Sequence, residues 1–382
     1  MKESKLTQNQ MQKVIVDERG MLDVPYLVLT LLLVAIGLVM LFSASYASAI
    51  SDGLSPTHYF IRQGGFAVVG VVVMLLVSRV NYQIWRFLAF WVLGGAILLL
   101  IAVAIPGIGV SHNGARRWIR IGVEFQPSEF AKLGVVLTFA AVMSVYRDKM
   151  KTFRYGVLPF AAILVVIAVL LYLEPQMSAT VIILMVGAIM MFLGGTRLRW
   201  FALGAAAGVL LVFVYLSTKG YASDRIMAWR DPTQYARDEG YQIIQSLYAI
   251  GSGGLFGLGF GRSRQKYLYL PEPENDDLFA IACEEQGLVG ALLILLLFVL
   301  LIVRGYWIAL HARDRFGSLL VSGLTTLLAL QVFFNIGVVT NFLPATGISL
   351  PFFSYGGTAL VLQLAEMGIV LSVSRWNTTQ LI

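Results

Sequence analysis

The sequence predicts an all-α polytopic membrane protein with about ten transmembrane helices, and three observations carry this prediction. Of the 382 residues, 58% are hydrophobic and 13% are charged, a balance that excludes an ordinary soluble domain. The apolar residues gather in runs of about 20, the length needed to cross a bilayer core of about 30 Å. No stretch alternates apolar and polar residues as the strands of a membrane barrel would.

The apolar runs form a group of seven and a group of three. The first group covers residues 24–46, 62–79, 86–106, 128–146, 156–173, 177–194 and 198–216, and the second covers 278–303, 318–341 and 356–374. The first run is longer than the apolar part of a signal peptide, so we expect it to be retained as a helix. The expected organisation is a cytoplasmic tail (1–20), a single ten-helix membrane domain (21–376) with a large extracytoplasmic loop (217–277) between helices 7 and 8, and a cytoplasmic C-terminus (377–382).

The basic residues predict the topology. With the N-terminus in the cytoplasm, 16 of the 28 Lys and Arg residues lie on the inner side, which agrees with the positive-inside rule. An even number of helices then places both termini in the cytoplasm. The other 12 sit in two outer clusters, after helix 3 and between helices 7 and 8, and they indicate an anionic partner such as a phosphate group. The net charge of +7 reflects the inner bias and predicts no nucleic-acid partner.

Two acidic positions lie at the outer ends of helices. Glu129 and Lys132 fall three residues apart at the start of helix 4, where they can pair. The pair either joins helices structurally or orients the nearby Arg116 and Arg117. Glu174, followed by Pro175 in the short turn after helix 5, is either a supporting site residue or an exposed turn acid.

The end of the large loop carries the densest set of polar residues. Gln242 and Gln245 share one face of a segment with helical spacing, and the glycine-rich run 251–261 that follows matches no nucleotide-binding motif. Its glycines fit either a close approach of two backbones or motion next to Arg262, Arg264 and Lys266. Asp276 and Asp277 precede helix 8, where helix capping alone would explain one of them. They could also bind a divalent ion, although their spacing is not diagnostic of a metal site. Cys283 is the single cysteine, which excludes an internal disulfide and a cysteine-based metal site.

The last outer connection, residues 335–358, is broken by prolines and glycines and includes Ser354. Irregular backbone of this kind is tolerated at membrane depth where it is buried in protein or lines a cavity. We therefore expect it to belong to a site or to its wall.

Five motifs, in this order, make the chain resemble the SEDS family of peptidoglycan glycosyltransferases (FtsW, RodA, SpoVE). They are NGARRWIRIG with FQPSEFAKL at 113–133, LEPQMSAT at 173–180, GYQIIQSLYAIGSGGLFGLGFG at 240–261, YLPEPENDDLFAIACEEQG at 269–287 and NIGVVTNFLPATGISLPFFSYGGT at 335–358. The resemblance spans all ten predicted helices, and RQKYLYLPEP looks more like the FtsW/SpoVE branch. Two positions depart from the family pattern: Asp277 stands where an aromatic residue is usual, and Gln176 where an Asp is familiar.

The resemblance implies polymerisation of lipid II with inversion, in cell division or a related process of wall synthesis. It implies Asp276 as the essential acid, which we expect to act as the base on the acceptor hydroxyl. The leaving diphosphate needs positively charged side chains to stabilise it, and the candidates are Arg116, Arg117, Arg262 and Lys266. Mg²⁺ or Mn²⁺ could share that task, with Asp276 and Asp277 as candidate ligands, and no organic cofactor is expected. The supporting candidates are Glu129, Lys132, Glu174, Gln245 and Ser354.

The resemblance also implies a class B penicillin-binding transpeptidase as partner, together with other division-complex proteins, and an active site on the outer face of the bacterial cytoplasmic membrane. Two other functions remain open from the sequence, a lipid II flippase and a non-catalytic scaffold for a transpeptidase. Transporters usually place charges at the membrane midplane within repeated halves. The sequence shows its charges mainly at the outer edge and no internal repeat.

Overall fold

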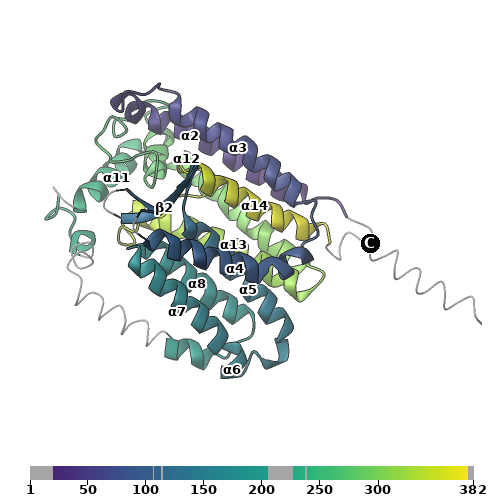
Figure 1. The fold of residues 1–382 in the computed structure, drawn as a ribbon. Helices are drawn as coiled ribbons and strands as arrows, with labels where there is room; N and C mark the ends of the chain where they lie inside the picture. The colour runs from purple at the N-terminus through teal and green to yellow at the C-terminus, as the bar shows by residue number, and fades with distance from the viewer. Residues whose placement is uncertain (1–19, 106, 113–114, 205–226, 237–238, 377–382) are drawn as a thin grey trace, which may run out of the picture.

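The computed structural model describes residues 20–105, 107–112, 115–204, 227–236 and 239–376. Within these residues, eight helices are long and apolar enough to cross a membrane, and Met177–Leu193 is a shorter apolar helix. The prediction of an all-α polytopic membrane fold is confirmed (Figure 1). Most of the predicted helix 7, both predicted tails and the first part of the large loop lie outside the described residues.

The helix bounds follow the predicted apolar runs closely. The bundle contains α2 (Val24–Ser51), α3 (His58–Val77), α4 (Gln83–Ala104), α5 (Pro127–Val145), α6 (Phe153–Gly156), α7 (Leu158–Leu173), α8 (Met177–Leu193), α11 (Glu239–Gly253), α12 (Leu278–Leu310), α13 (Arg315–Val339) and α14 (Gly357–Ser374). Asp23 starts α2 because its side chain accepts a hydrogen bond from the backbone N–H of Tyr26. Pro127 occupies the first turn of α5, where its missing N–H costs nothing.

The two ends of the described chain meet at one end of the bundle. The backbone N–H of Gly20 donates to the carbonyl of Arg375 at 3.0 Å. At the same end, Arg304 near the C-terminus of α12 pairs with Asp23 at 2.8 Å. Because α12 crosses the bundle from there, its N-terminal end, which Asp277 precedes, lies at the opposite end of the bundle (Figure 1).

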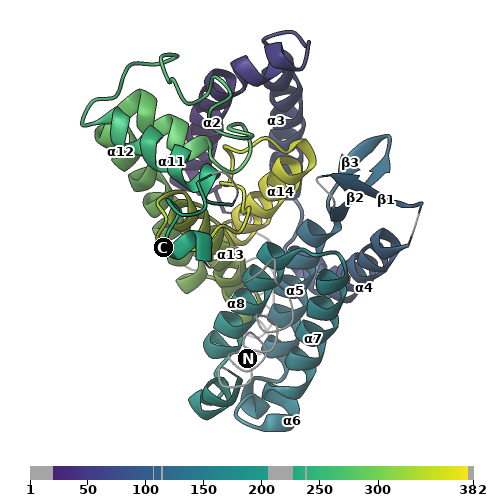
Figure 2. The same cartoon turned by 90° about the vertical axis from the view of Figure 1, so that its left-hand side faces the viewer.

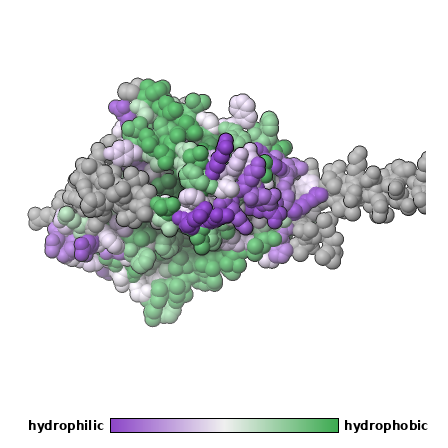
Figure 3. Space-filling model, turned by 90° about the horizontal axis from the view of Figure 1, so that it is seen from below, coloured by the Kyte–Doolittle hydropathy of each residue, from purple (hydrophilic) through white to green (hydrophobic). Residues whose placement is uncertain are grey.

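Helices α13, α5 and α14 are largely buried and form the centre of the bundle. Helix α3 packs on α14 and α2, whereas α4, its neighbour in sequence, packs on α5 and α7 (Figure 2). Helix α12 lies between α11, α13 and α2. The outward faces of these helices are broadly apolar, and Figure 3 shows hydrophilic side chains in a main zone right of centre and in a smaller patch at the left. Such a surface suits lipid as its solvent.

A small antiparallel sheet connects α4 to α5, and the sequence analysis did not predict it. Its strands β1 (Gly109–His112), β2 (Ala115–Ile121) and β3 (Val123–Phe125) pair in the order β1-β2-β3. Gly122, at φ +71°, makes the tight turn between β2 and β3. The hydroxyl of Thr358 donates to the carbonyl of Glu124, which fastens β3 to the first turn of α14. The sheet therefore carries Arg116 and Arg117 to the end of the bundle that holds Asp276.

Helix α12 is kinked at Gly287, whose backbone (φ +67°, ψ −169°) is not helical. The glycine-rich loop fills the break: the N–H of Leu258 donates to Glu284 O at 2.9 Å, and the N–H of Leu288 donates to Gly254 O at 2.9 Å. A Cβ atom at Gly257 would lie 2.1 Å from the carbonyl oxygen of Glu285. The close backbone approach expected of the glycine run is therefore confirmed.

Candidate functional site

Asp276 sits where the large loop enters α12, against the connection between α13 and α14. The side-chain N–H₂ of Asn335 in α13 donates to the carbonyls of both Asp276 and Ile348, at 2.7 Å each, and so joins the two segments. The carboxylate of Asp276 accepts from the Ser349 hydroxyl at 3.4 Å. Gly347 has a φ of +65°, and a Cβ atom there would lie 3.2 Å from Asp276 Oδ2. Glycine therefore suits this position. The broken connection therefore lies against Asp276, the candidate base.

The environment of Asp276 raises the pKa of its carboxyl group to about 7. The largest cause is burial, and the negative charges of Asp277 and Glu272 add to it, while the Ser349 hydrogen bond and the Arg117 charge oppose it. The residue is half-buried, which leaves part of it accessible to a bound molecule. A carboxyl group with a pKa near neutrality is suited to take up a proton from a substrate hydroxyl.

Asp277 has a different role from the one that helix capping would give it. It occupies the N-cap position of α12, but its side chain makes no capping hydrogen bond. Instead it accepts from Gln242 Nε2 at 2.5 Å and from Ser246 Oγ at 2.9 Å, both on α11. The side chain is buried, and burial raises the pKa of Asp277 to about 6. The capping explanation is therefore wrong for this residue, which fastens α11 to α12.

The same geometry tests whether the chain itself builds a metal site. Asp276 faces Ser349 while Asp277 faces Gln242 and Ser246, so their contacts lead to different partners. Among the residues that the structure describes, no group of three or more His, Cys, Asp or Glu side chains has the arrangement of a metal site. Of the two candidate ligands, Asp277 is already engaged by Gln242 and Ser246, which leaves the carboxylate of Asp276. A single carboxylate does not fit an ion held by protein ligands alone.

Arg117 is the predicted basic residue that the structure brings to Asp276. It lies on β2, and its Nη2 donates to the Pro175 carbonyl at 2.5 Å. Its positive charge lowers the pKa of both Asp276 and Glu174 against the effect of burial. Arg116 is adjacent and exposed. Arg262 is exposed on the loop before α12, and no contact joins it to Asp276 within the described chain.

Glu174 is a buried acid, not an exposed one. Only 1% of its surface is accessible, and neither carboxylate oxygen has a hydrogen-bond partner among the described residues. Burial raises the pKa of Glu174 to about 8, so the group is largely neutral at pH 7. A neutral Glu174 adds no negative charge beside Arg117.

Replacing Glu174 with Gln is expected to change stability in a pH-dependent way. The folded state raises the pKa of Glu174, so folding favours its protonated form, and the wild type loses stability as pH rises from about 4.5 to about 8. The Glu174→Gln variant lacks this loss. Its melting temperature in detergent should exceed that of the wild type at about pH 8.5 and equal it near pH 4.5. A constant difference between the two proteins across this range would contradict the assignment.

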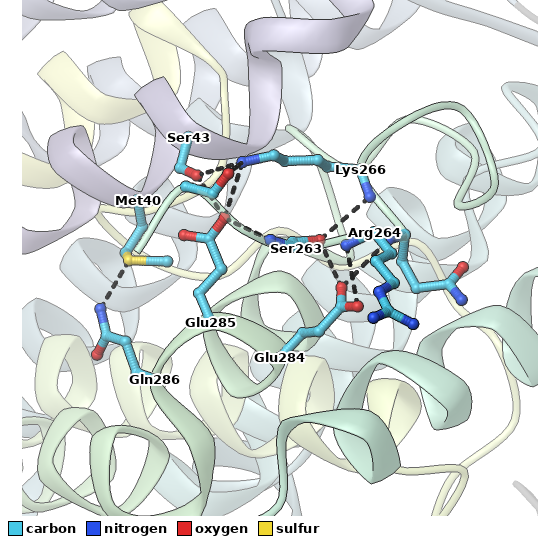
Figure 4. A network of polar contacts seen from close by, with 10 residues as sticks. Met40, Ser43, Ser263, Arg264, Lys266, Glu284, Glu285 and Gln286 are labelled. Carbon is cyan, nitrogen blue, oxygen red and sulfur yellow. Dashed lines mark hydrogen bonds and ion pairs between the residues drawn. The ribbon is translucent and has the colours of Figure 1, made fainter. Parts of the chain in front are cut away.

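Lys266 is engaged in a buried network with Ser43 and Glu285 (Figure 4). Its ammonium group donates to Glu285 Oε1 at 2.9 Å, to Ser43 Oγ at 3.0 Å and to the Gly261 carbonyl at 2.7 Å. Only 2% of Lys266 is exposed. This arrangement does not fit the expected binding of diphosphate, because the charge is already paired inside the protein.

The neighbouring Glu284 holds the same loop. Its carboxylate accepts from the backbone N–H groups of Arg264 at 3.0 Å and Gln265 at 3.2 Å, and also from the Ser263 hydroxyl. Both glutamates lie in the first half of α12, between Asp277 and the kink. The loop before Asp276 is thus fixed to α12 by the two buried carboxylates of Glu284 and Glu285.

Glu129 and Lys132 form the predicted ion pair, with Lys132 Nζ 2.7 Å from Glu129 Oε1. Lys132 is 5% exposed. Glu366 of α14, which the sequence analysis did not single out, lies within electrostatic reach of both residues. Its signal was present, because a lone acid within an apolar helix is a marker of function in a membrane protein. Nine residues into α14, it lies about 14 Å from the start of the helix, so charge is not confined to the outer edge.

The remaining supporting candidates do not contact Asp276. Ser354 closes the turn before α14, with its hydroxyl accepting from the Leu350 N–H at 2.8 Å. Its carbonyl accepts from Gln63 Nε2 of α3 at 3.2 Å. Gln245 is half-buried on α11, and Gln176 donates to the Ser128 hydroxyl at 2.9 Å, which ties α8 to α5. Ser349, Asn335 and Ser246 are the contacts that sequence reasoning missed, because each lies more than 25 positions from the acid that it touches.

Comparison with known proteins assigns the family. The family described as "Cell cycle protein", which groups FtsW, RodA and SpoVE, matches residues 24–379. The chain belongs to this family. It is 40% identical to stage V sporulation protein E of Bacillus subtilis (strain 168) over 93% of this chain and 97% of that protein. It is 39% identical to the probable peptidoglycan glycosyltransferase FtsW of Geobacter sulfurreducens (strain DL-1 / KN400), covering 92% and 95% of the two chains.

Solved structures share the fold. A chain from a peptidoglycan synthase complex, studied for the coordination of polymerization and crosslinking, superposes with a TM-score of 0.77 at 29% identity and covers 93% of this chain and 98% of that one. The rod shape determining protein RodA of Thermus thermophilus superposes with a TM-score of 0.69 at 28% identity, covering 94% and 98%. The resemblance to FtsW, RodA and SpoVE expected from the five motifs is confirmed.

Proposed function

We propose that this protein is a peptidoglycan glycosyltransferase that polymerises lipid II into glycan strands with inversion. Its relatives include proteins named as probable peptidoglycan glycosyltransferases, and this chain matches them over nearly its whole length. The observation that carries the proposal is the half-buried carboxyl group of Asp276. Its pKa is raised to about 7, and the positive charge of Arg117 acts on it. That pairing combines a base with a group that can stabilise a leaving anion.

The reaction then follows from these two groups. The 4-hydroxyl of the acceptor sugar gives its proton to the Asp276 carboxylate while its oxygen attacks the anomeric carbon of the donor strand. The bond from that carbon to the undecaprenyl diphosphate breaks on the opposite face, which inverts the configuration. The diphosphate leaves with the bonding electrons, and Arg117 with Arg116 offsets its growing charge. Glu174, held neutral by burial, does not compete for Arg117.

A divalent ion could bind at this place only with help from the substrate. Mg²⁺ commonly uses one or two carboxylates together with substrate phosphates and water. Asp276 would be the protein ligand, because the carboxylate of Asp277 is taken up by Gln242 and Ser246. The ion would supply positive charge to the diphosphate, and the steps described above do not depend on it.

The proposed setting is the outer face of the bacterial cytoplasmic membrane. Asp276 lies at the end of the bundle opposite the paired ends of the described chain, near which Arg304 and Arg375 are found. The positive-inside rule assigns that basic end to the cytoplasm. The proposed partner is a class B penicillin-binding transpeptidase, because one structural relative belongs to a peptidoglycan synthase complex.

The pH dependence of polymerisation should report the titration of Asp276. The base works as a carboxylate, so kcat/KM should rise with pH and level off above about 7. The negative charge of Asp277 contributes to the raised pKa of Asp276, and Asp277→Asn should therefore move the midpoint of this rise to lower pH. Initial rates with labelled lipid II between about pH 5 and about pH 9 would measure both effects. A midpoint that stays in place in the variant would contradict the coupling.

A direct test uses the purified full-length protein in detergent, with its transpeptidase partner, and labelled lipid II. Glycan strands visible on a gel are the expected result. The ionisable side chains of Lys132, Glu129 and Glu366 within the bundle favour a second candidate, a lipid II flippase, because charged residues within a helix bundle are common in transporters. Protein in vesicles that moves lipid II across the bilayer and makes no polymer would establish that alternative. If the protein shows neither polymerisation nor lipid II transport but still binds the transpeptidase, it acts as a scaffold.

A further inference from the structure

A recess lies in the loop that leads to Asp276, away from the Asp276 contacts described above. It has a volume of about 420 Å³ and is lined by Arg264, Gln265, Tyr267 and Tyr269. The two tyrosines are 54% and 58% exposed, although both belong to a segment that is otherwise fixed. Exposed aromatic rings next to a hydrogen-bonding amide and a guanidinium are typical of a binding site.

The frame of the recess is rigid. Glu284 binds the backbone N–H groups of Arg264 and Gln265, and Lys266 between the lining residues is buried against Glu285 (Figure 4). The backbone N–H of Leu270 donates to the Gln265 carbonyl at 3.0 Å, and the Lys266 ammonium lies 5.8 Å from the centre of the Tyr267 ring. A recess held in this way loses little conformational freedom when a molecule binds.

One polar atom of the recess lacks a partner. The Oε1 atom of Gln265 is buried and accepts no hydrogen bond within the described residues. Leaving a buried acceptor unpaired is unfavourable. A small rotation about the soft terminal torsion of the side chain would present this oxygen to a bound hydroxyl or amide N–H. The unpaired atom therefore points to a ligand that carries such donors.

We propose that the recess is a saccharide subsite, which holds the growing glycan strand several sugars away from the reacting bond. This inference rests on the proposed glycosyltransferase function. The apolar C–H faces of pyranose rings stack on Tyr267 and Tyr269, and sugar hydroxyl and acetamido groups pair with Arg264 and Gln265. Asp276 follows Tyr269 by seven positions, so the two lie at most about 25 Å apart. A strand held there stays with the enzyme between additions.

The first test measures binding without catalysis. Full-length protein in detergent is titrated with a fluorescent β-1,4-linked N-acetylglucosamine tetramer. The Tyr267→Ala/Tyr269→Ala variant should bind it at least about 10-fold more weakly, whereas Tyr267→Phe/Tyr269→Phe, which keeps the rings, should bind nearly as the wild type does. Phe256→Ala is the matched control, because Phe256 is an 81% exposed aromatic residue of the same loop that does not line the recess. Equal binding by the wild type and the alanine variant, or no binding by either, would overturn the proposal.

The second test measures chain length. With lipid II, the alanine variant should form the first coupled product at the wild-type rate but release shorter strands, since it no longer retains them. A variant that keeps tetramer binding and chain length but no longer co-purifies with the transpeptidase would make the recess a protein-docking surface and overturn the proposal. Failure of the wild type to polymerise lipid II would instead refute the proposed function, and the binding titration would still report on the recess itself.

Discussion

Replacement of Asp276 by Asn is expected to reduce glycan polymerisation by about 10²- to 10⁴-fold, the usual contribution of a general base. The amide has the same shape and can still accept from the Ser349 hydroxyl, but it cannot take up the proton of the acceptor sugar. Folding should be preserved, because the Asn335 clamp binds the Asp276 backbone carbonyl and not its side chain. The rate of polymer formation from labelled lipid II, measured beside the melting temperature, checks both expectations.

Asp277→Asn is the matched control for this experiment. The introduced amide would still accept from Ser246, although its N–H₂ group would face the Gln242 amide, so a loss of stability and a smaller loss of rate are expected. Polymerisation should persist in this variant. If Asp277→Asn were folded and as inactive as Asp276→Asn, then Asp277 would be the base and Asp276 would have another role.

The membrane fold could be predicted from the sequence because the physical signal is strong. An apolar run of about 20 residues has few alternatives to a transmembrane helix, and the predicted runs at 128–146 and 356–374 match α5 and α14 within a residue. The sheet before α5 was missed because its strands are only three to seven residues long and show no clean alternation. Short strands depend on tertiary contacts, such as the one between Thr358 and Glu124, that local pattern does not reveal.

The candidate site could be predicted only in part, because local pattern does not reveal contacts between distant segments. The sequence motifs located Asp276 and Arg117, but they could not distinguish the surroundings of Asp276 from those of Asp277. That difference depends on Ser246 and Ser349, which lie 31 and 73 positions from their acids. The burial of Lys266 was hidden as well, since its partners Ser43 and Glu285 come from two other helices. A charge that looks free in sequence can be fully paired once distant segments meet.

Lys266→Ala is expected to destabilise the protein by about 3–5 kcal/mol, because it leaves the Glu285 carboxylate buried without its counter-charge. The Glu285 side chain is fully buried, so water cannot replace the lost ammonium group. Arg120→Ala is the control: its ion pair with Glu124 is exposed, with 63% of the Arg120 side chain accessible, and such pairs contribute about 0–1 kcal/mol. Unfolding in detergent with increasing denaturant would compare the two variants.

A double variant separates the pair's internal role from a role in binding. Lys266→Met with Glu285→Gln removes both charges, and it should recover much of the stability that Lys266→Ala loses, since no uncompensated charge remains. Because Lys266 is turned toward Glu285 and Ser43, the KM for lipid II in the double variant should stay near the wild-type value, whereas Arg117→Ala should raise it. A raised KM in the double variant, at wild-type stability, would return Lys266 to the diphosphate site. A near-normal KM would make the Lys266–Glu285 pair the element that fixes the loop before Asp276, leaving Arg117 as the cation beside the base.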